Sequence, residues 1–351
     1  EFKSLTDVSG ALDVRKNKEN SWDLKLESIN VQSKKKILID NLNVYGKVTW
    51  SNGGTLNIDN FSIDDIGDIV SYFESTIDIH STGIFSGHIS WDKQITNPQN
   101  IISQSSLNNL SIKSSDTNIP SINNAYIKLN TNNSKVNCSI ALQNSTIKYP
   151  SVMLQPIIIS LNSNLDVNLE SALLVNLRNI SVKNNDFALN GQVSYNLESN
   201  IIDAKLVVPF FNLAKAYKYV PVAVGKNAAN DFEKNLQGMM QNIKITAHGS
   251  PESFPFINES DSYFTVDGNI NNINYLWQDG WPKLLNTNGT LKVRNQNVLF
   301  TVGKSQIGNL RVHDGTASIP NFVAKKSELI VSGSMTNPTE EFMKFGLDTP
   351  Y

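Results

Sequence analysis

Residues 187–195 read Phe-Ala-Leu-Asn-Gly-Gln-Val-Ser-Tyr, a stretch in which apolar and polar residues alternate around a central glycine. Such alternation is typical of a β-strand with one face on an apolar surface and the other in water. The pattern returns at residues 264–270 and, in a related form, at residues 84–91. Glycine weakens the middle of a strand, so its recurrence indicates bends or close backbone approach in a curved sheet.

Period-two alternation continues outward over most of the chain, as at residues 42–50, 125–129 and 165–169. A sheet with one apolar face must be covered by another layer, curl on itself or hold an apolar ligand. Helical patterns are too few and too short to cover it. We therefore predict an all-β fold with a few short helices, an elongated and strongly curved antiparallel β-sheet that forms a taco-like groove or a solenoid. The sequence leaves open whether the interior is a dry core or an open groove.

The alternation lapses between Pro209 and Gly225, but no Gly/Ser-rich or Pro-rich linker marks the lapse. We predict that one sheet continues through it. The first segment, residues 1–208, is expected to contain a short helix near 65–74. The second, residues 209–351, is expected to contain helices near 211–217, 230–238 and 338–345.

The amino-acid composition indicates some structural features and excludes others. The sequence contains 47 Asn, a residue that tolerates left-handed backbone, which predicts many tight turns. A compositional bias of the genome is the alternative explanation. A net charge of −2 argues against electrostatic capture of nucleic acid. The lone Cys138 excludes an internal disulfide, and its strand-like surroundings indicate a small packed side chain.

No apolar run reaches the roughly 20 residues of a membrane-spanning helix, and no signal peptide is visible. We expect an internal fragment whose targeting or anchoring segments lie outside it.

Residues that could carry catalysis or bind metal do not converge. His80 and His88 are expected to flank a hairpin, yet no third ligand accompanies them at zinc-site spacing. Asp267 opens a faint calcium-loop pattern that lacks the required Gly and the twelfth-position Glu. Gly303-Lys304-Ser305 lacks the upstream glycine of a phosphate loop and is expected to be a turn between strands. We predict no catalytic residue, no metal and no cofactor.

The apolar positions of the alternation are the remaining candidates for a site. Each of these apolar residues either lines a groove for an apolar ligand or belongs to the packed core of the sheet, and the pattern favours the two alternatives about equally. The groove candidates are Val44, Val48, Leu56, Ile58, Leu165, Val167, Leu189, Val193, Val266 and Ile270.

Several short motifs follow one another in a definite order and spacing. The earlier ones are residues 61–73 and Gly83-Ile-Phe-Ser-Gly-His-Ile-Ser-Trp91. The later ones are Tyr219-Val-Pro221, Phe232–Leu236 with Gly238, residues 249–256, Gly280-Trp281-Pro282, Ile319-Pro320, Val331-Ser-Gly333 and Asp348-Thr-Pro350. Together the motifs resemble the AsmA-like superfamily, and the later ones resemble its YhdP branch. Phe232 departs from the pattern, because the family usually has Trp there.

The resemblance implies a periplasmic section of an inner-membrane-anchored, bridge-like lipid transfer protein of Gram-negative bacteria. Phospholipid acyl chains would move along an apolar groove toward the outer membrane. The inner membrane would be reached through a segment absent from this chain, and an outer-membrane or periplasmic protein is a possible partner. The alternative is a structural or assembly β-solenoid, such as an envelope assembly factor or an adhesin segment, with a dry interior and protein partners.

Overall fold

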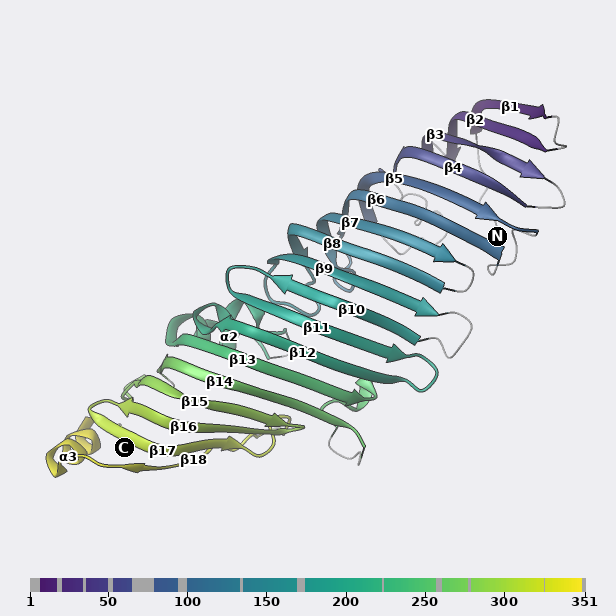
Figure 1. The fold of residues 1–351 in the computed structure, drawn as a ribbon. Helices are drawn as coiled ribbons and strands as arrows, with labels where there is room; N and C mark the ends of the chain where they lie inside the picture. The colour runs from purple at the N-terminus through teal and green to yellow at the C-terminus, as the bar shows by residue number, and fades with distance from the viewer. Residues whose placement is uncertain are drawn as a thin grey trace. The chain divides into compact units, whose positions relative to one another are not determined.

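The computed structural model describes residues 7–17, 21–33, 36–49, 53–64, 79–93, 100–132, 135–168, 174–222, 224–256, 261–276, 279–324 and 326–348. Over these ranges the chain forms eighteen strands, paired antiparallel wherever their register is defined, and a few short helices (Figure 1). The predicted all-β class is confirmed. The chain divides into two compact units: unit 1 contains residues 1–151 and 155–177, and unit 2 contains residues 152–154 and 178–351. The predicted division at residue 208 stays a prediction.

Unit 1 is a meander in which each strand pairs antiparallel with the next. Its strands are β1 (Asp7–Lys16), β2 (Trp22–Ser33), β3 (Lys36–Thr49), β4 (Gly53–Ser62), β5 (Ile79–Trp91), β6 (Ile101–Ser114), β7 (Ser121–Asn132), β8 (Lys135–Lys148) and β9 (Ile157–Asn168). β10 (Leu174–Lys183) begins in unit 1 and ends in unit 2. The helix expected near 65–74 lies outside the described residues.

Unit 2 is a second antiparallel meander. Its strands are β11 (Phe187–Asn196), β12 (Ile201–Asn212), β13 (Leu236–Gly249), β14 (Tyr263–Tyr275), β15 (Leu284–Arg294), β16 (Asn297–Ile307), β17 (Leu310–Ile319) and β18 (Ile330–Met335). Its helices are the 3-10 helices η2 (Leu213–Tyr219) and η3 (Pro251–Ser253) and the α-helices α2 (Lys226–Asn235) and α3 (Thr339–Asp348). α2 ends earlier than the pattern near 230–238 indicated, because Leu236–Gly238 already belong to β13.

Strand register gives each unit two chemically different faces, because directly opposed residues lie on the same side of a sheet. In unit 1 one such row is Leu12, Leu26, Val44, Ile58, Gly87, Ser105, Leu129, Cys138 and Leu165. The row one residue further along is Asp13, Lys25, Tyr45, Asn57, His88, Gln104, Asn130, Asn137 and Asp166. We call the first side the apolar face and the second the polar face.

Unit 2 repeats this division. One row is Gly191, Leu206, Ile245, Val266, Val293, Val298 and Ile319. Its neighbour is Gln192, Lys205, Thr246, Thr265, Arg294 and Asn297. A Cβ on Gly191 would lie 2.2 Å from the Lys205 carbonyl oxygen, so the central glycine of residues 187–195 marks a close backbone approach, as the sequence predicted.

Two asparagines in left-handed conformation, Asn200 and Asn295, lie in turns, as the composition predicted. Nine others lie within strands: Asn41, Asn60, Asn109, Asn124, Asn144, Asn179, Asn242, Asn272 and Asn286, with φ between 48° and 55°. All but Asn179, whose register is not defined, coincide with a register shift of their strand. Such β-bulges bend a strand and increase its twist, and Asn is among the few residues that adopt this backbone readily. Figure 1 shows strands of each unit turning sharply toward one end.

The residue after each left-handed Asn points into the bend. Six of these nine residues are buried: Leu110, Ala125, Ser145, Ile180, Ile243 and Thr287. Their hydroxyl members are paired, since Ser145 donates to the Asn124 carbonyl and Thr287 contacts the Ser305 hydroxyl at 2.7 Å. The β-bulge at each left-handed Asn, which we call an Asn-bulge, therefore also determines which side chains form the core of the sheet.

A reciprocal hydrogen-bond pair stabilises the bend between neighbouring strands. The backbone N–H of Asn41 donates to Asn30 Oδ1, and the N–H of Ser28 donates to Asn43 Oδ1, each at 2.9 Å. In unit 2 the N–H of Asn272 donates to Asn288 Oδ1 at 3.0 Å, and that of Asn286 to Asn274 Oδ1 at 2.9 Å. In these two pairs each left-handed residue has its exposed N–H satisfied by an Asn two positions beyond the bulge on the adjacent strand.

Candidate functional site

The apolar face is only partly covered by the side chains around it. In unit 1, Leu12 is 65% exposed and Val14 43% exposed, while Leu26, Val44 and Ile58 are half-buried. In a two-layered sheet such residues would be almost fully buried. The accessible surface of the whole chain, 21527 Å², also indicates incomplete cover, because it exceeds that of compact domains. Two compact domains of half this mass would together expose roughly 17,000 Å².

All six candidates in unit 1 lie on the apolar face. Val44, Ile58 and Leu165 share one row. Leu56 and Val167 share the next row. Val48, opposite Trp22 and Gly54, belongs to the row beyond it. Register brings these residues to one side of the sheet, and their role in binding stays a prediction.

In unit 2, Val193, Val266 and Ile270 lie on the apolar face in three different rows. Leu189 sits at the register shift between Ala188 and Asn190. Ile270 is only 3% exposed, so it belongs to the packed core of the bend more than to an open surface.

The groove candidates taken from the alternation did not include the aromatic residues at one end of this face. Phe187 and Phe211 are register partners in a row that continues through Met240 and Ile270. The ring of Tyr219, from η2, packs edge-on against Phe187 at 5.2 Å and against Phe211 at 5.6 Å between centroids. The signal available in the sequence was the adjacent pair Phe210-Phe211, followed closely by Tyr219.

Tyr219 belongs to a helical insertion, which we define as residues 213–235, containing η2 and α2. It leaves the sheet after β12 and rejoins it at β13, although neighbouring antiparallel strands need only a short turn. Its buried residues are Leu213, Ala216, Val220 and Ala229. The helical insertion therefore covers one end of the apolar face of unit 2.

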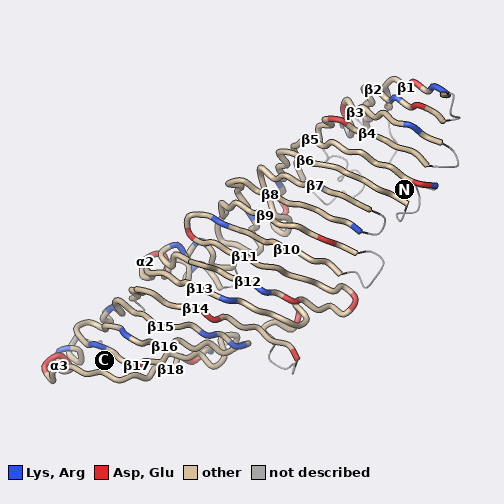
Figure 2. Tube along the Cα trace, viewed as in Figure 1, with Lys and Arg blue, Asp and Glu red and all other residues tan. Residues whose placement is uncertain are grey.

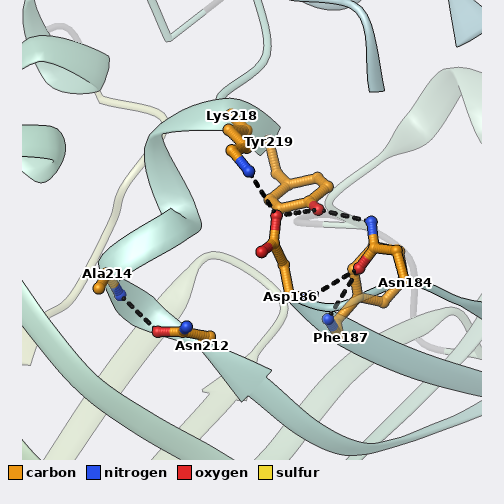
Figure 3. A network of polar contacts seen from close by, with 7 residues as sticks. All are labelled: Asn184, Asp186, Phe187, Asn212, Ala214, Lys218 and Tyr219. Atoms are coloured by element: carbon orange, nitrogen blue, oxygen red, sulfur yellow. Dashed lines mark hydrogen bonds and ion pairs between the residues drawn. The ribbon is translucent and has the colours of Figure 1, made fainter. Parts of the chain in front are cut away.

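A polar network holds the helical insertion to the start of β11 (Figure 3). The buried Asp186 carboxylate accepts hydrogen bonds from Lys218 Nζ and from the Tyr219 hydroxyl, both at 2.9 Å. Asn184 donates from Nδ2 to the Tyr219 oxygen at 2.8 Å and accepts from the backbone N–H groups of Asp186 and Phe187. Burial is the main cause that raises the pKa of Tyr219 to about 12.

A second contact fixes the far end of the insertion. The Tyr275 hydroxyl on β14 donates to Asp231 of α2 at 2.7 Å, and Asn235 Nδ2 donates to the same carboxylate at 2.7 Å. Burial, followed by this hydrogen bond, raises the pKa of Tyr275 to about 12.

The opposite end of the strands in unit 2 is covered by the connection between β13 and β14. Phe254 packs against Phe264 at 5.1 Å and against Phe256 at 5.9 Å between centroids. Phe256 is 2% exposed, and its carbonyl accepts a hydrogen bond from Asn295 Nδ2. Phe264 shares a row of the apolar face with Val193.

Two expectations about polar residues are wrong. His80 and His88 do not flank a hairpin, because both lie in β5, which continues through the glycines between them. Gly303, Lys304 and Ser305 lie within β16 and form no turn, because residues 297–307 pair along both neighbouring strands. Among the described residues, no three His, Cys, Asp or Glu are placed to hold a metal ion.

Charged side chains are dispersed along the strands (Figure 2). On the polar face of unit 2, Arg294 pairs with Asp267 at 2.8 Å, and His248 contacts Asp203 at 2.6 Å. Within the described ranges, no helix has both the length and the apolar character that crossing a bilayer requires.

Residues 2–350 match the family described as YhdP protein. The chain belongs to the YhdP family. It is also 24% identical over 139 residues to "Intermembrane phospholipid transporter YhdP" of Escherichia coli (strain K12). That match covers 39% of this chain and 11% of the relative. The resemblance drawn from the short motifs is thereby confirmed.

In this YhdP-family chain, three of the motifs that carried the resemblance lie in or beside the covers of unit 2. Residues 219–221 end η2 and residues 232–235 end α2, both in the helical insertion, and residues 249–256 lead through η3. Gly280-Trp281-Pro282 lies between β14 and β15, where Pro282 approaches Gly308.

Proposed function

We propose that this chain is a section of a lipid transfer protein whose apolar face holds phospholipid acyl chains. The observation that carries the proposal is the amphipathic register of both units, with partly exposed apolar rows opposite charged and amide rows. Membership of the YhdP family and the similarity to a bacterial intermembrane phospholipid transporter support the same reading.

The energetics favour a continuous apolar face over a tight pocket. Each methylene removed from water contributes about 0.8 kcal/mol, so a 16-carbon chain in water costs roughly 12 kcal/mol. The Leu, Val and Ile of these rows, which are partly exposed, offset this cost along the sheet. A lipid held by such rows can slide, because successive positions are similar in free energy.

The length of an apolar row in unit 1 suits the binding of an acyl chain. Nine strands spaced about 4.8 Å apart give a row of unit 1 a length of roughly 38 Å. An acyl chain spans about half of a 30 Å hydrocarbon core, or roughly 15 Å. One row is therefore more than twice as long as one chain, which suits continuous occupancy.

We further propose that the protein works in the periplasm as part of a bridge, anchored to the inner membrane through a segment outside this chain and carrying phospholipid toward the outer membrane. Phospholipid is the expected ligand, and a protein at the outer membrane or in the periplasm is an expected partner. Family membership and the name of the curated relative support this placement.

The decisive test compares one charge placed on each face. Ile58→Asp puts a carboxylate in the centre of an apolar row, whereas Asn57→Asp puts it on the adjacent residue of the polar face. Phospholipid that copurifies with the full-length protein, measured by mass spectrometry, should fall at least about tenfold for Ile58→Asp, since a central charge in a hydrocarbon path costs about 2.5–3.5 kcal/mol. Asn57→Asp should retain wild-type lipid.

Equal lipid content in the two variants would contradict the proposal. Absence of lipid from the wild-type protein, together with photo-crosslinks from Ile58 only to protein, would favour the structural β-solenoid. Circular dichroism of both variants shows whether the sheet is intact.

A further inference from the structure

The helical insertion lies directly on the path that the proposed function requires. Tyr219 packs on Phe187 and Phe211, and their row continues through Met240 to Ile270. Beyond Ile270 the same row passes through Gly289, Val302 and Gly315 on β15–β17. An acyl chain on this row would meet the insertion at β11–β13.

The two helices of the insertion are held differently. α2 has one buried residue, Ala229, and is held mainly by the polar contacts of Asp231. η2 is held by its buried Leu213 and Ala216, by the ring of Tyr219 and by the Asp186 carboxylate. Between the helices, Pro221 pairs with Met153, and the Val222 N–H donates to the Val152 carbonyl at 2.9 Å. Lys218 is 34% exposed, so water can reach its ammonium group and solvate it after release.

The insertion also contains a hinge residue. Gly225, between η2 and α2, has φ 94°, a conformation open to glycine at little cost, and its Cβ position has open space around it. The side chain of Asn212 caps η2 where the insertion leaves β12, by accepting from the Ala214 N–H at 3.1 Å. Movement can therefore occur at Gly225 without breaking the strand pairing of β12 with β13.

We propose that the helical insertion is a lipid-displaceable gate on the apolar face, closed when Lys218 and Tyr219 bind Asp186 and open when they release it. This inference rests on the proposed function. Opening onto water would expose Phe187 and Phe211, which the hydrophobic effect opposes. An arriving acyl chain removes that penalty by covering the same rings, so the ligand binds the open state better and shifts the equilibrium toward it.

The gate can be tested in the full-length protein with the photo-crosslinker benzoylphenylalanine. One reporter replaces Met240, in the row under the insertion, and a second replaces Val298, on β16 in a different row. Asp186→Asn and Tyr219→Phe weaken the closed state, and Tyr219→Phe keeps the ring that packs on Phe187. Asp267→Asn is the matched control, because it removes a carboxylate paired with a cation on the polar face.

Phospholipid crosslinking at Met240 should rise about two- to tenfold in Asp186→Asn and in Tyr219→Phe, the population change expected for one lost hydrogen bond. Crosslinking at Met240 should stay at the wild-type level in Asp267→Asn. Crosslinking at Val298 should be the same in all three variants.

An unchanged Met240 signal in both gate variants would overturn the gate while leaving the proposed function intact. No lipid at Val298 in any protein would contradict the proposed function itself. Hydrogen exchange separates release from unfolding: residues 213–235 should lose protection while β11–β14 keep theirs. Loss of protection throughout β11–β14 would overturn the gate, because Asp186 would then hold the sheet together.

Discussion

Unit 1 and unit 2 bend their strands with the same device, and among the described residues the helical cover of the resulting face belongs to unit 2. Both have left-handed Asn in mid-strand and the reciprocal Asn hydrogen bonds, at β2–β3 in unit 1 and β14–β15 in unit 2. The helices whose bounds the structure gives all belong to unit 2, where the helical insertion lies on the apolar face. The curvature of the sheet thus comes from a strand design that both units repeat. The cover of the apolar face is local, because it comes from the lengthened connection between β12 and β13.

The largest effect should come from residues buried in the bend. Leu142→Ala in unit 1 and Ile243→Ala in unit 2, which are 4% and 7% exposed, create cavities beside an Asn-bulge. Each should lower the free energy of unfolding by about 2–5 kcal/mol. Urea denaturation gives the loss, and hydrogen exchange assigns it to one unit. The control Leu12→Ala, at a 65% exposed position, should change stability by less than about 0.5 kcal/mol. A large loss in one unit alone would break the comparison.

A smaller effect should follow from the bulge residue itself. Asn41→Val and Asn272→Val force a β-branched residue into a left-handed conformation, at φ 51° and 55°. Each should cost about 1–3 kcal/mol, by strain and by weakening the reciprocal pair. The same two positions changed to Gly should cost much less, since Gly adopts this backbone freely. Denaturation midpoints of the four variants measure the difference, and Val and Gly variants of equal stability would show that the bulge is not under strain.

The smallest effect should be a loss of stability of unit 2 at alkaline pH. Tyr219 and Tyr275 have pKa values raised from 10.0 to about 12, because burial favours the neutral phenol. Their contribution to stability is complete below pH 10 and is lost as pH rises toward 12, since the unfolded chain ionises first. The urea midpoint followed by near-UV circular dichroism should fall in this range. The double variant Tyr219→Phe, Tyr275→Phe should flatten the fall, and an equal fall in that variant would assign the effect to other groups.

The sequence predicted the class of fold because period-two alternation depends only on neighbouring residues. It also placed Val44, Ile58, Leu165 and other candidates at positions that register brings to one face. The Asn-rich composition predicted turns, which Asn200 and Asn295 form, but it did not predict the larger number of left-handed Asn at β-bulges within strands. The available signal was the recurring pattern of Asn, then an apolar or small residue, then Asn, Ser or Thr, as in residues 41–43, 109–111 and 272–274.

The cover of unit 2 could not be derived in the same way. Asp186, Lys218 and Tyr219 meet only because the helical insertion folds back on β11, and no local periodicity encodes that contact. Short helices were expected near 211–217 and 230–238, yet the face they cover depends on tertiary packing. The prediction that His80 and His88 flank a hairpin failed for the opposite reason, since β5 continues through residues that usually interrupt a strand.

The reciprocal Asn pairs have a consequence for how such chains can vary in length. Each pair is complete within two adjacent strands and draws on no distant residue. Gain or loss of one hairpin elsewhere in the sheet therefore leaves each of these pairs complete and keeps the rows in phase. Two strand spacings add about 10 Å. A protein built this way can adjust its reach in regular steps, with each step independent of the rest of the sheet.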